Sequence, residues 1–145
     1  MKILVLNGPN LNLLGKRDPR HYGSLTLDQI NAQLDQLAKS LGAECIFFQS
    51  NHEGALIDFI QKNTSNASGI LINPGALTHY GYSLRDALSD TRLPIVEVHL
   101  SDISNREEFR KIDLLDGIVL EKIVGLKEKS YTVGLQKLLE HLQNK

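Results

Sequence analysis

The chain has 145 residues, with 16 basic and 17 acidic side chains and a formal net charge of -1. This length suits one domain, residues 1–145, whose core needs neither a disulfide nor a structural metal. The near-zero net charge gives no electrostatic reason to expect a nucleic acid or a membrane surface as a partner. A small neutral or anionic ligand stays possible.

Cysteine content and the N-terminal sequence indicate the compartment. The single cysteine, Cys45, cannot form an internal disulfide and lies in the apolar run of residues 45–48, so we expect a buried structural thiol rather than a nucleophile. The first apolar run, residues 3–6, is far shorter than a signal-peptide core or a membrane span. The cytoplasm is therefore the expected compartment.

Short apolar runs and stretches of helical periodicity alternate along the chain. The runs that predict strands are residues 3–6, 43–49, 69–72, 95–100 and a fifth from Gly117 to Leu120 or further. Between the first two strands, residues 16–23 are too irregular for a helix or strand and are expected to form a surface loop.

The predicted helices follow the strands. Thr26 and Gln29 form a capping box for the first helix, which Gly42 ends. Apolar spacing then predicts a helix through residues 56–60 that ends near Asn63, one through 84–88, a short helical turn around 106–110 and a closing helix at 130–142.

Alternating strands and helices of this length predict right-handed crossovers and a parallel sheet. The expected fold class is α/β, a flavodoxin-like doubly wound sheet of five parallel strands with helices on both faces. Ligands of such sheets bind at the carboxyl ends of the strands. Polar residues stand at those ends, at positions 7–10, 51–52, 73 and 99–101.

The turn after the first predicted strand does not match three motifs that are typical of nucleotide-binding or phospho-receiver proteins. Six residues separate Gly8 from Gly15, and Arg17 stands where a P-loop has the Ser or Thr that binds magnesium. The turn has no glycine-x-glycine element for a dinucleotide. A phospho-receiver domain would have carboxylates here, where the sequence has amides.

A metal site is not expected. None of the five histidines forms a His-x-x-x-His pair, and the chain has no Cys-x-x-Cys pair. The carboxylate nearest to a histidine at same-face spacing is Glu97, for which an orienting role beside His99 explains the spacing better.

Glu97 and His99 are two positions apart on a predicted strand, so their side chains leave the same face, and Val96, Val98 and Leu100 leave the other. A carboxylate fixes the tautomer of a neighbouring imidazole and raises its basicity, as general acid–base catalysis requires. The alternative is a buried ion pair that closes the strand end. The position at the carboxyl end of the strand favours the functional reading.

Tyr22 follows Arg17 by five positions, with Pro19 between them. The plain interpretation is a loop tyrosine that covers apolar surface beside a solvated arginine. In the alternative, the guanidinium favours the ionised phenol and makes the tyrosine a credible base.

Several short motifs follow one another in a fixed order. They are NGPNLNLLG at 7–15, R-x-P-x-x-Y-G at 17–23, INPGA-x-TH at 72–79, RDA at 85–87, EVHLS at 97–101 and REEFR at 106–110. Together they closely resemble the type II 3-dehydroquinate dehydratases. The family often has a Ser-x-x-Ser and glycine-rich passage next, where residues 111–116 read KIDLLD, and Asp102 stands where asparagine is common.

This resemblance implies the reversible dehydration of 3-dehydroquinate to 3-dehydroshikimate in aromatic amino-acid biosynthesis, through an enolate and without a cofactor. It implies that Tyr22 is the base and Arg17 stabilises its phenolate. Asn10, through a water, would steady the enolate oxygen, and His99, oriented by Glu97, would protonate the departing hydroxyl.

The resemblance also implies the remaining substrate contacts. They come from Asn73, His79, Asp86, Leu100, Ser101 and Arg110. Such enzymes are homododecamers built of trimers, in which Asp86 would reach the site of a neighbouring subunit. The alternative from another class is a catalytically silent flavodoxin-like module that binds a small carboxylate. An intact Arg17, Tyr22 and His99 argue against it, because binding alone needs no paired base and acid.

Overall fold

Five parallel strands form one sheet, in the order β2-β1-β3-β4-β5, in the computed structural model, which describes residues 1–145. The strands are β1 (Lys2–Asn7), β2 (Glu44–Gln49), β3 (Gly69–Asn73), β4 (Ile95–His99) and β5 (Glu121–Val124). Every neighbouring pair is parallel, so the predicted α/β fold class is confirmed.

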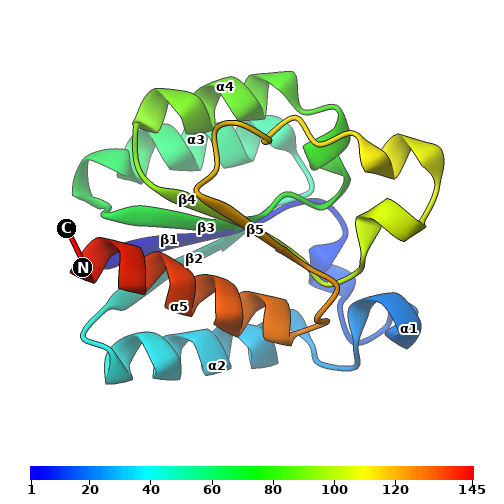
Figure 1. Ribbon diagram of the computed structural model, residues 1–145, viewed down its shortest axis with the longest axis horizontal. Helices are drawn as coiled ribbons and strands as arrows, with labels where there is room; N and C mark the ends of the chain where they lie inside the picture. The colour runs from blue at the N-terminus through cyan, green and yellow to red at the C-terminus, as the bar shows by residue number, and fades with distance from the viewer.

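Two pairs of helices cover the sheet. In Figure 1, α2 (Leu27–Ser40) and α5 (Lys129–Gln143) lie below it, and α3 (Glu53–Asn63) and α4 (Tyr82–Thr91) lie above it. Each layer buries its own apolar cluster, of 18 residues on the α2 and α5 side and 11 on the other. The two chain termini lie together at the end of the molecule opposite to α1 (Pro19–Tyr22) (Figure 1).

The sequence pattern of the central strands explains the two layers. In β1, Ile3 and Val5 join the larger cluster, whereas Leu4 and Leu6 join the smaller one. A strand that is apolar at every position is typical of a parallel sheet buried on both faces. In β4 the pattern breaks, because Glu97 lies on the face opposite to the side chains of the larger cluster and is nevertheless fully buried.

The predicted capping box of α2 is confirmed. Thr26 Oγ1 accepts a hydrogen bond from the backbone N–H of Gln29, and Gln29 Oε1 accepts one from the backbone N–H of Thr26. This reciprocal pair satisfies two amide donors that the first turn of a helix leaves free.

Two predicted elements are wrong in detail. Residues 19–22 form the short helix α1, because Asp18 accepts a hydrogen bond from the Arg20 N–H and Pro19 occupies the first helical position. The fifth strand begins at Glu121 rather than at Gly117, which has a φ of 91° in a turn. Such a φ favours glycine and does not occur within a regular strand.

Five short 3-10 helices lie in the connections. They are η1 (Leu11–Leu13), η2 (Thr64–Asn66), η3 (Gly75–His79), η4 (Ile103–Asn105) and η5 (Glu108–Lys111). The last of them, η5, corresponds to the helical turn predicted around residues 106–110. All of them except η2 follow the carboxyl end of a strand, where the loops gather on the right of Figure 1.

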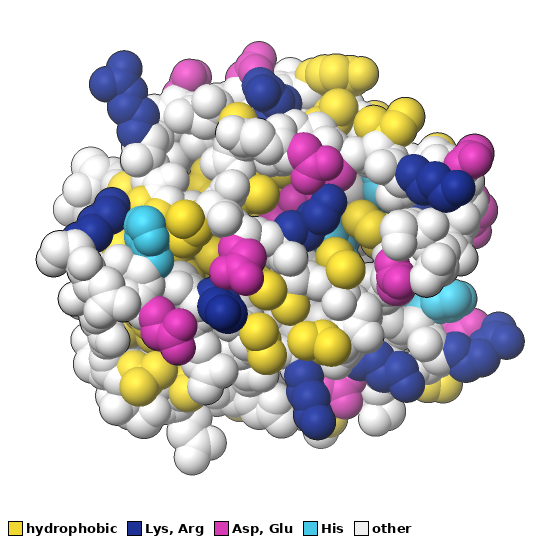
Figure 2. Space-filling model, in the orientation of Figure 1, with side chains coloured by type: hydrophobic (Ala, Val, Ile, Leu, Met, Phe, Trp, Pro, Cys, Tyr) yellow, Lys and Arg dark blue, Asp and Glu magenta, His cyan; other side chains and the backbone are white.

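One face of the molecule is mixed in charge. Figure 2 shows basic and acidic side chains interspersed over one face, without a large area of one sign. None of the helices has the length and apolar character needed to span a bilayer.

Candidate active site

A pocket opens at the carboxyl ends of β1, β3 and β4. It is lined by Pro9, Asn10, Leu11, Arg17, Tyr22, Asn73, Gly75, Ala76, His79, His99, Leu100, Ser101, Ile103, Arg106 and Arg110. Nine of the eleven predicted site residues are in this set. The lining has three guanidinium groups and no carboxylate, a charge balance that suits an anionic ligand.

The turns after β1 and β3 form the floor of the pocket and touch each other. Gly8 N–H donates to the Asn73 carbonyl over 2.8 Å, and a Cβ atom at Gly8 would lie 2.2 Å from the Pro74 carbonyl oxygen. Only glycine fits at that position. Asn10 follows with a positive φ of 71°, and its N–H donates to Asn51 Oδ1 over 2.9 Å. These contacts fix the backbone from which Asn10 enters the pocket.

Tyr22 is held by two arginines. The Cζ atom of Arg17 lies 3.7 Å from the centroid of the Tyr22 ring, whereas Arg106 Nη1 donates a hydrogen bond to the phenolic oxygen over 2.7 Å. Arg106 also contacts Ser101 Oγ over 3.3 Å. Partial burial is the main cause of the lowered pKa of Arg17. The nearby phenol of Tyr22 opposes this shift. The site thus places two positive groups beside one phenol.

His99 is paired with Glu97, as we predicted from the two-residue spacing that places both side chains on the same face of the strand. His99 Nε2 lies 2.6 Å from Glu97 Oε1, and both side chains are buried. Glu97 does not line the pocket but lies behind His99, where Thr78 Oγ1 donates to Glu97 Oε1 over 2.5 Å. Burial raises the pKa of Glu97, and the contact with His99 opposes this shift. An imidazole in this arrangement turns its Nδ1 away from Glu97.

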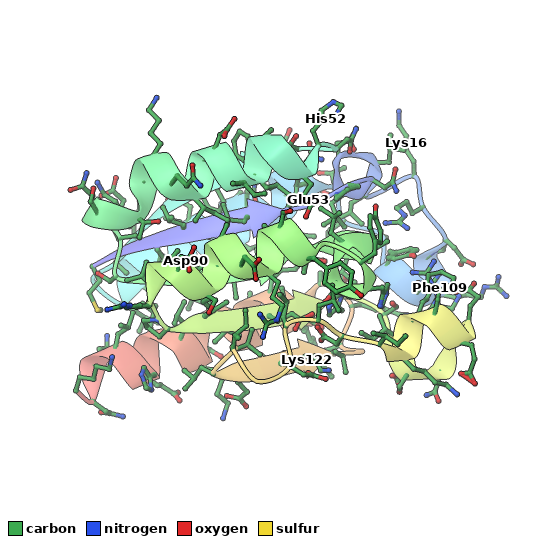
Figure 3. All side chains as sticks on the ribbon, turned by 90° about the horizontal axis from the view of Figure 1, so that it is seen from above. Lys16, His52, Glu53, Asp90, Phe109 and Lys122 are labelled. Carbon is green, nitrogen blue, oxygen red and sulfur yellow. The ribbon has the colours of Figure 1, made fainter.

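His79 and Arg110 come from η3 and η5. His79 Nδ1 donates to the Ile112 carbonyl oxygen over 2.5 Å, which fixes the proton on Nδ1 because a carbonyl only accepts. Partial burial lowers the pKa of His79, and hence favours a neutral ring. Arg110 pairs with Glu107. Lys16 and Phe109, on the two loop segments that flank the pocket, lie at the same end of the molecule in Figure 3.

A buried network supports Asn73. Tyr131 of α5 donates its hydroxyl to Asn7 Oδ1 over 2.5 Å and accepts from Asn73 Nδ2 over 2.9 Å. Asn73 Oδ1 accepts the Gly75 N–H over 3.1 Å. Complete burial raises the pKa of Tyr131, so this phenol stays neutral. The network fixes which way the Asn73 amide faces.

Asp86 is the second predicted residue that lies outside the pocket. It is on α4, its side chain is 77% exposed, and its carboxylate lies 3.7 Å from Arg85. Cys45 is buried, in agreement with the sequence, and burial raises its pKa to about 11.

Sequence reasoning missed three residues that contact the predicted set. Arg106 and Thr78 were each part of a motif but received no role, and Tyr131 carried no signal that separated it from other hydroxyl residues. The partners of all three are distant in the sequence, so only the fold brings them together.

One group of potential metal ligands is present. Glu97, His99 and Asp113 each offer one atom, and these atoms lie within 4.8 Å of one another. The ammonium of Lys122, which lies 3.1 Å from Asp113 Oδ2, already supplies a positive charge to this group.

Comparison with known proteins agrees with the geometry. A family model described as dehydroquinase class II matches residues 1–139. A 3-dehydroquinate dehydratase of Roseiflexus castenholzii is 52% identical over 96% of this chain and 88% of its own length. One of Acaryochloris marina is 53% identical over 97% and 95%, respectively.

Solved structures show the same relationship. The crystal structure of the type II dehydroquinase from Butyrivibrio crossotus aligns with a TM-score of 0.91 and 44% identity, over 95% of this chain and 97% of that one. The type II dehydroquinase from Propionibacterium acnes aligns with a TM-score of 0.90 and 37% identity, over 96% of each chain. The chain therefore belongs to the class II dehydroquinase family.

Proposed function

We propose that this enzyme dehydrates 3-dehydroquinate to 3-dehydroshikimate, reversibly and through an enolate, in the shikimate pathway. The observation that carries the proposal is that Tyr22, held by two guanidiniums, and His99, paired with Glu97, line one pocket. A base and an acid in one site are what an elimination of water requires.

Tyr22 begins the reaction as the base. Its phenolate removes a proton from the carbon beside the substrate ketone, and Arg106 and Arg17 compensate the negative charge that the phenolate carries before this step. The electron pair of the broken C–H bond moves into the ketone and gives an enolate. Asn10, through a water, steadies the enolate oxygen.

His99 completes the elimination. Its imidazole donates a proton to the departing hydroxyl, the enolate returns its electrons to form the carbon–carbon double bond, and one water molecule leaves. Glu97 holds the ring through its contact with Nε2. Proton transfer from the Tyr22 hydroxyl back to the imidazole, directly or through water, restores both groups for the next turnover.

The remaining pocket residues bind the substrate. Arg110 lines the pocket and faces the carboxylate, and Asn73, His79, Ser101 and the backbone at Leu100 contact the hydroxyl groups. Asn73 and His79 suit this task because hydrogen bonds to Tyr131 and to the Ile112 carbonyl fix their orientation.

We propose that the protein is a cytoplasmic homododecamer made of trimers. Asp86 is exposed and outside the pocket of its own chain, as a residue that completes a neighbouring site would be. Large apolar side chains are exposed at Tyr82, 68%, and Ile112, 58%. Sedimentation equilibrium tests the assembly, and a monomer at micromolar concentration would contradict it.

The test of the reaction is direct. Purified protein is incubated with 3-dehydroquinate, and the enone absorbance of the product is followed, with heat-inactivated protein as the control. Product formation supports the proposal. Binding of the substrate without product would favour the alternative of a silent carboxylate-binding module.

A further inference from the structure

A buried cluster of polar groups lies behind His99. Thr78 Oγ1 lies 2.5 Å from Glu97 Oε1 and 2.8 Å from Asp113 Oδ1. Asp113 follows η5, and its side chain is only 1% exposed. Lys122, labelled on the edge strand β5 in Figure 3, is in register with Glu97 and places its Nζ 3.1 Å from Asp113 Oδ2.

The cluster has too few protons if both carboxyl groups are ionised. Thr78 has one hydroxyl proton for two carboxyl oxygens. Glu97 Oε2 is buried without a hydrogen-bond donor, and one carboxyl oxygen of Glu97 lies within 4.8 Å of one of Asp113. Two buried carboxyl groups this close together do not both ionise readily, because burial disfavours each negative charge and the two charges repel. This geometry therefore favours a state in which one of the two carboxyl groups, of Glu97 or of Asp113, is protonated.

The surrounding charges decide which carboxyl group holds that proton. Lys122 lies against Asp113, and Asp113 Oδ1 also accepts the Leu115 N–H over 2.8 Å. Burial acts to raise the pKa of Asp113, but the groups around its carboxylate, Glu97 first, lower this pKa overall. For Glu97 burial dominates and raises the pKa. The proton thus belongs on Glu97.

We infer that Asp113, fixed by Lys122, is a positioning residue that keeps a proton on Glu97, so that His99 contacts a neutral carboxylic acid in the resting enzyme. A neutral partner stabilises an imidazolium less than a carboxylate does. His99 consequently gives up its proton more readily to the leaving hydroxyl. This consequence rests on the proposed function, whereas the protonation of Glu97 does not.

The other charged groups around the pair leave this conclusion unchanged. Several of them line the same pocket as His99, namely Arg17, Tyr22, His79, Arg106 and Arg110. The remaining one is Asp116, whose carboxylate lies 3.1 Å from Lys122 Nζ. Asp116 is 63% exposed, so water screens its charge.

The first experiment measures the proton in the unmodified, ligand-free protein. Carboxyl ¹³C chemical shifts of labelled glutamate and aspartate are followed by NMR between pH 5 and 9. One glutamate carboxyl should keep the shift of a neutral acid at pH 7, and Glu97→Gln should remove that resonance. If every glutamate is a carboxylate at pH 7, the inference is overturned.

The second experiment measures the effect on His99. In Asp113→Asn the new amide donates to Glu97, which then ionises, and the imidazolium gains a partner of opposite charge. The alkaline limb of the turnover profile should move upward by ~1 pH unit or more. The control is Asp116→Asn, which changes the other carboxylate beside Lys122 and should leave the limb in place. Equal shifts in the two variants would overturn the inference.

A third measurement separates this inference from the proposed reaction. Titration of ¹⁵N-labelled histidines reports the ionisation of His99 without any substrate. The His99 resonance should show the same upward shift in Asp113→Asn even if no dehydration is observed. If Asp113→Asn does not fold, Asp113→Ser replaces it, and the carboxyl spectrum of the unmodified protein decides the question alone.

Discussion

Arg106 donates a hydrogen bond of 2.7 Å to the phenolic oxygen of Tyr22, a residue 84 positions earlier in the chain. Arg17, the partner that the sequence indicated, lies instead over the ring of the same tyrosine. The two guanidiniums therefore act on different parts of one side chain. The charge that most directly favours the phenolate comes from Arg106, because it contacts the oxygen itself.

Replacement of Arg106 should reduce turnover more than replacement of Arg17. A hydrogen bond to a charged group contributes ~1.5–3 kcal/mol, so Arg106→Met should lower kcat by ~10- to 100-fold. The pH at which activity rises should also move upward in Arg106→Met, because the phenolate loses an opposite charge. Steady-state kinetics of both variants from pH 5 to 10 test this, and a larger loss in Arg17→Met would reverse the ranking.

Tyr22→Phe should abolish most of the activity but not binding. Phenylalanine keeps the ring and its contact with Arg17 but removes the proposed base. General base catalysis contributes ~10²- to 10⁴-fold, and turnover should fall by at least that factor. Product affinity, measured by calorimetry, should stay within a few-fold of the parent. Normal turnover in this variant would leave His99 with Glu97 as the candidate base.

Tyr131→Phe tests the network beneath the pocket. The change leaves Asn7 Oδ1 and Asn73 Nδ2 buried without their shared partner. The free energy of unfolding should fall by ~1–3 kcal/mol. Tyr80→Phe is the matched control, since Tyr80 is 58% exposed and should change the stability little. Urea titrations of the two variants measure the difference, and equal stabilities would show that the network contributes nothing.

Residues 16–23 should be mobile in the empty site and ordered by ligand. The segment has three basic side chains before Tyr22, namely Lys16, Arg17 and Arg20, and Arg20 is 84% exposed at its side chain. Trypsin should therefore cut here in the free protein and more slowly with a product-like ligand present. Mass spectrometry identifies the cleaved bonds. Cleavage at equal rates in both states would argue against a lid.

Glu97→Gln should gain stability relative to the parent as the pH rises. The pKa of Glu97 in the folded protein is raised above its ordinary value of 4.5 by burial. The folded state therefore holds a proton that the unfolded chain releases, and this contribution is lost as the pH rises above 4.5. Glutamine has no such loss. Denaturation at pH 4 and pH 7.5 should show the advantage only at the higher pH, and a constant difference would contradict it.

Local signals in the sequence were sufficient to predict most of the helices and strands. The Thr26–Gln29 capping box and the apolar runs of the first four strands each depend on neighbouring residues, and the structure confirms them. The short helix α1 was missed because four residues are too few to show a periodicity. The start of the fifth strand was wrong because Gly117, an apolar residue by composition, adopts a turn conformation.

The contacts between pocket residues were less predictable than the helices and strands. Alternation along a strand was enough to pair Glu97 with His99, which are two positions apart. The contacts of Arg106 with Tyr22 and of Asp113 with Thr78 join loops that are far apart in the sequence. Such pairs depend on where the loops end in space, which periodicity and turn chemistry do not specify.

The bridge between Tyr22 and Arg106 also restricts how the two loops can vary. A change in the length or sequence of the loop that carries Tyr22, or of the loop that carries Arg106, would move one of these two side chains. The hydrogen bond from Arg106 to the phenolic oxygen would then be lost or lengthened. The loops are consequently coupled as mutational targets. Exchange of one loop with that of a relative should cost more activity than exchange of both together, so chimeras of this enzyme are best built from matched pairs of loops.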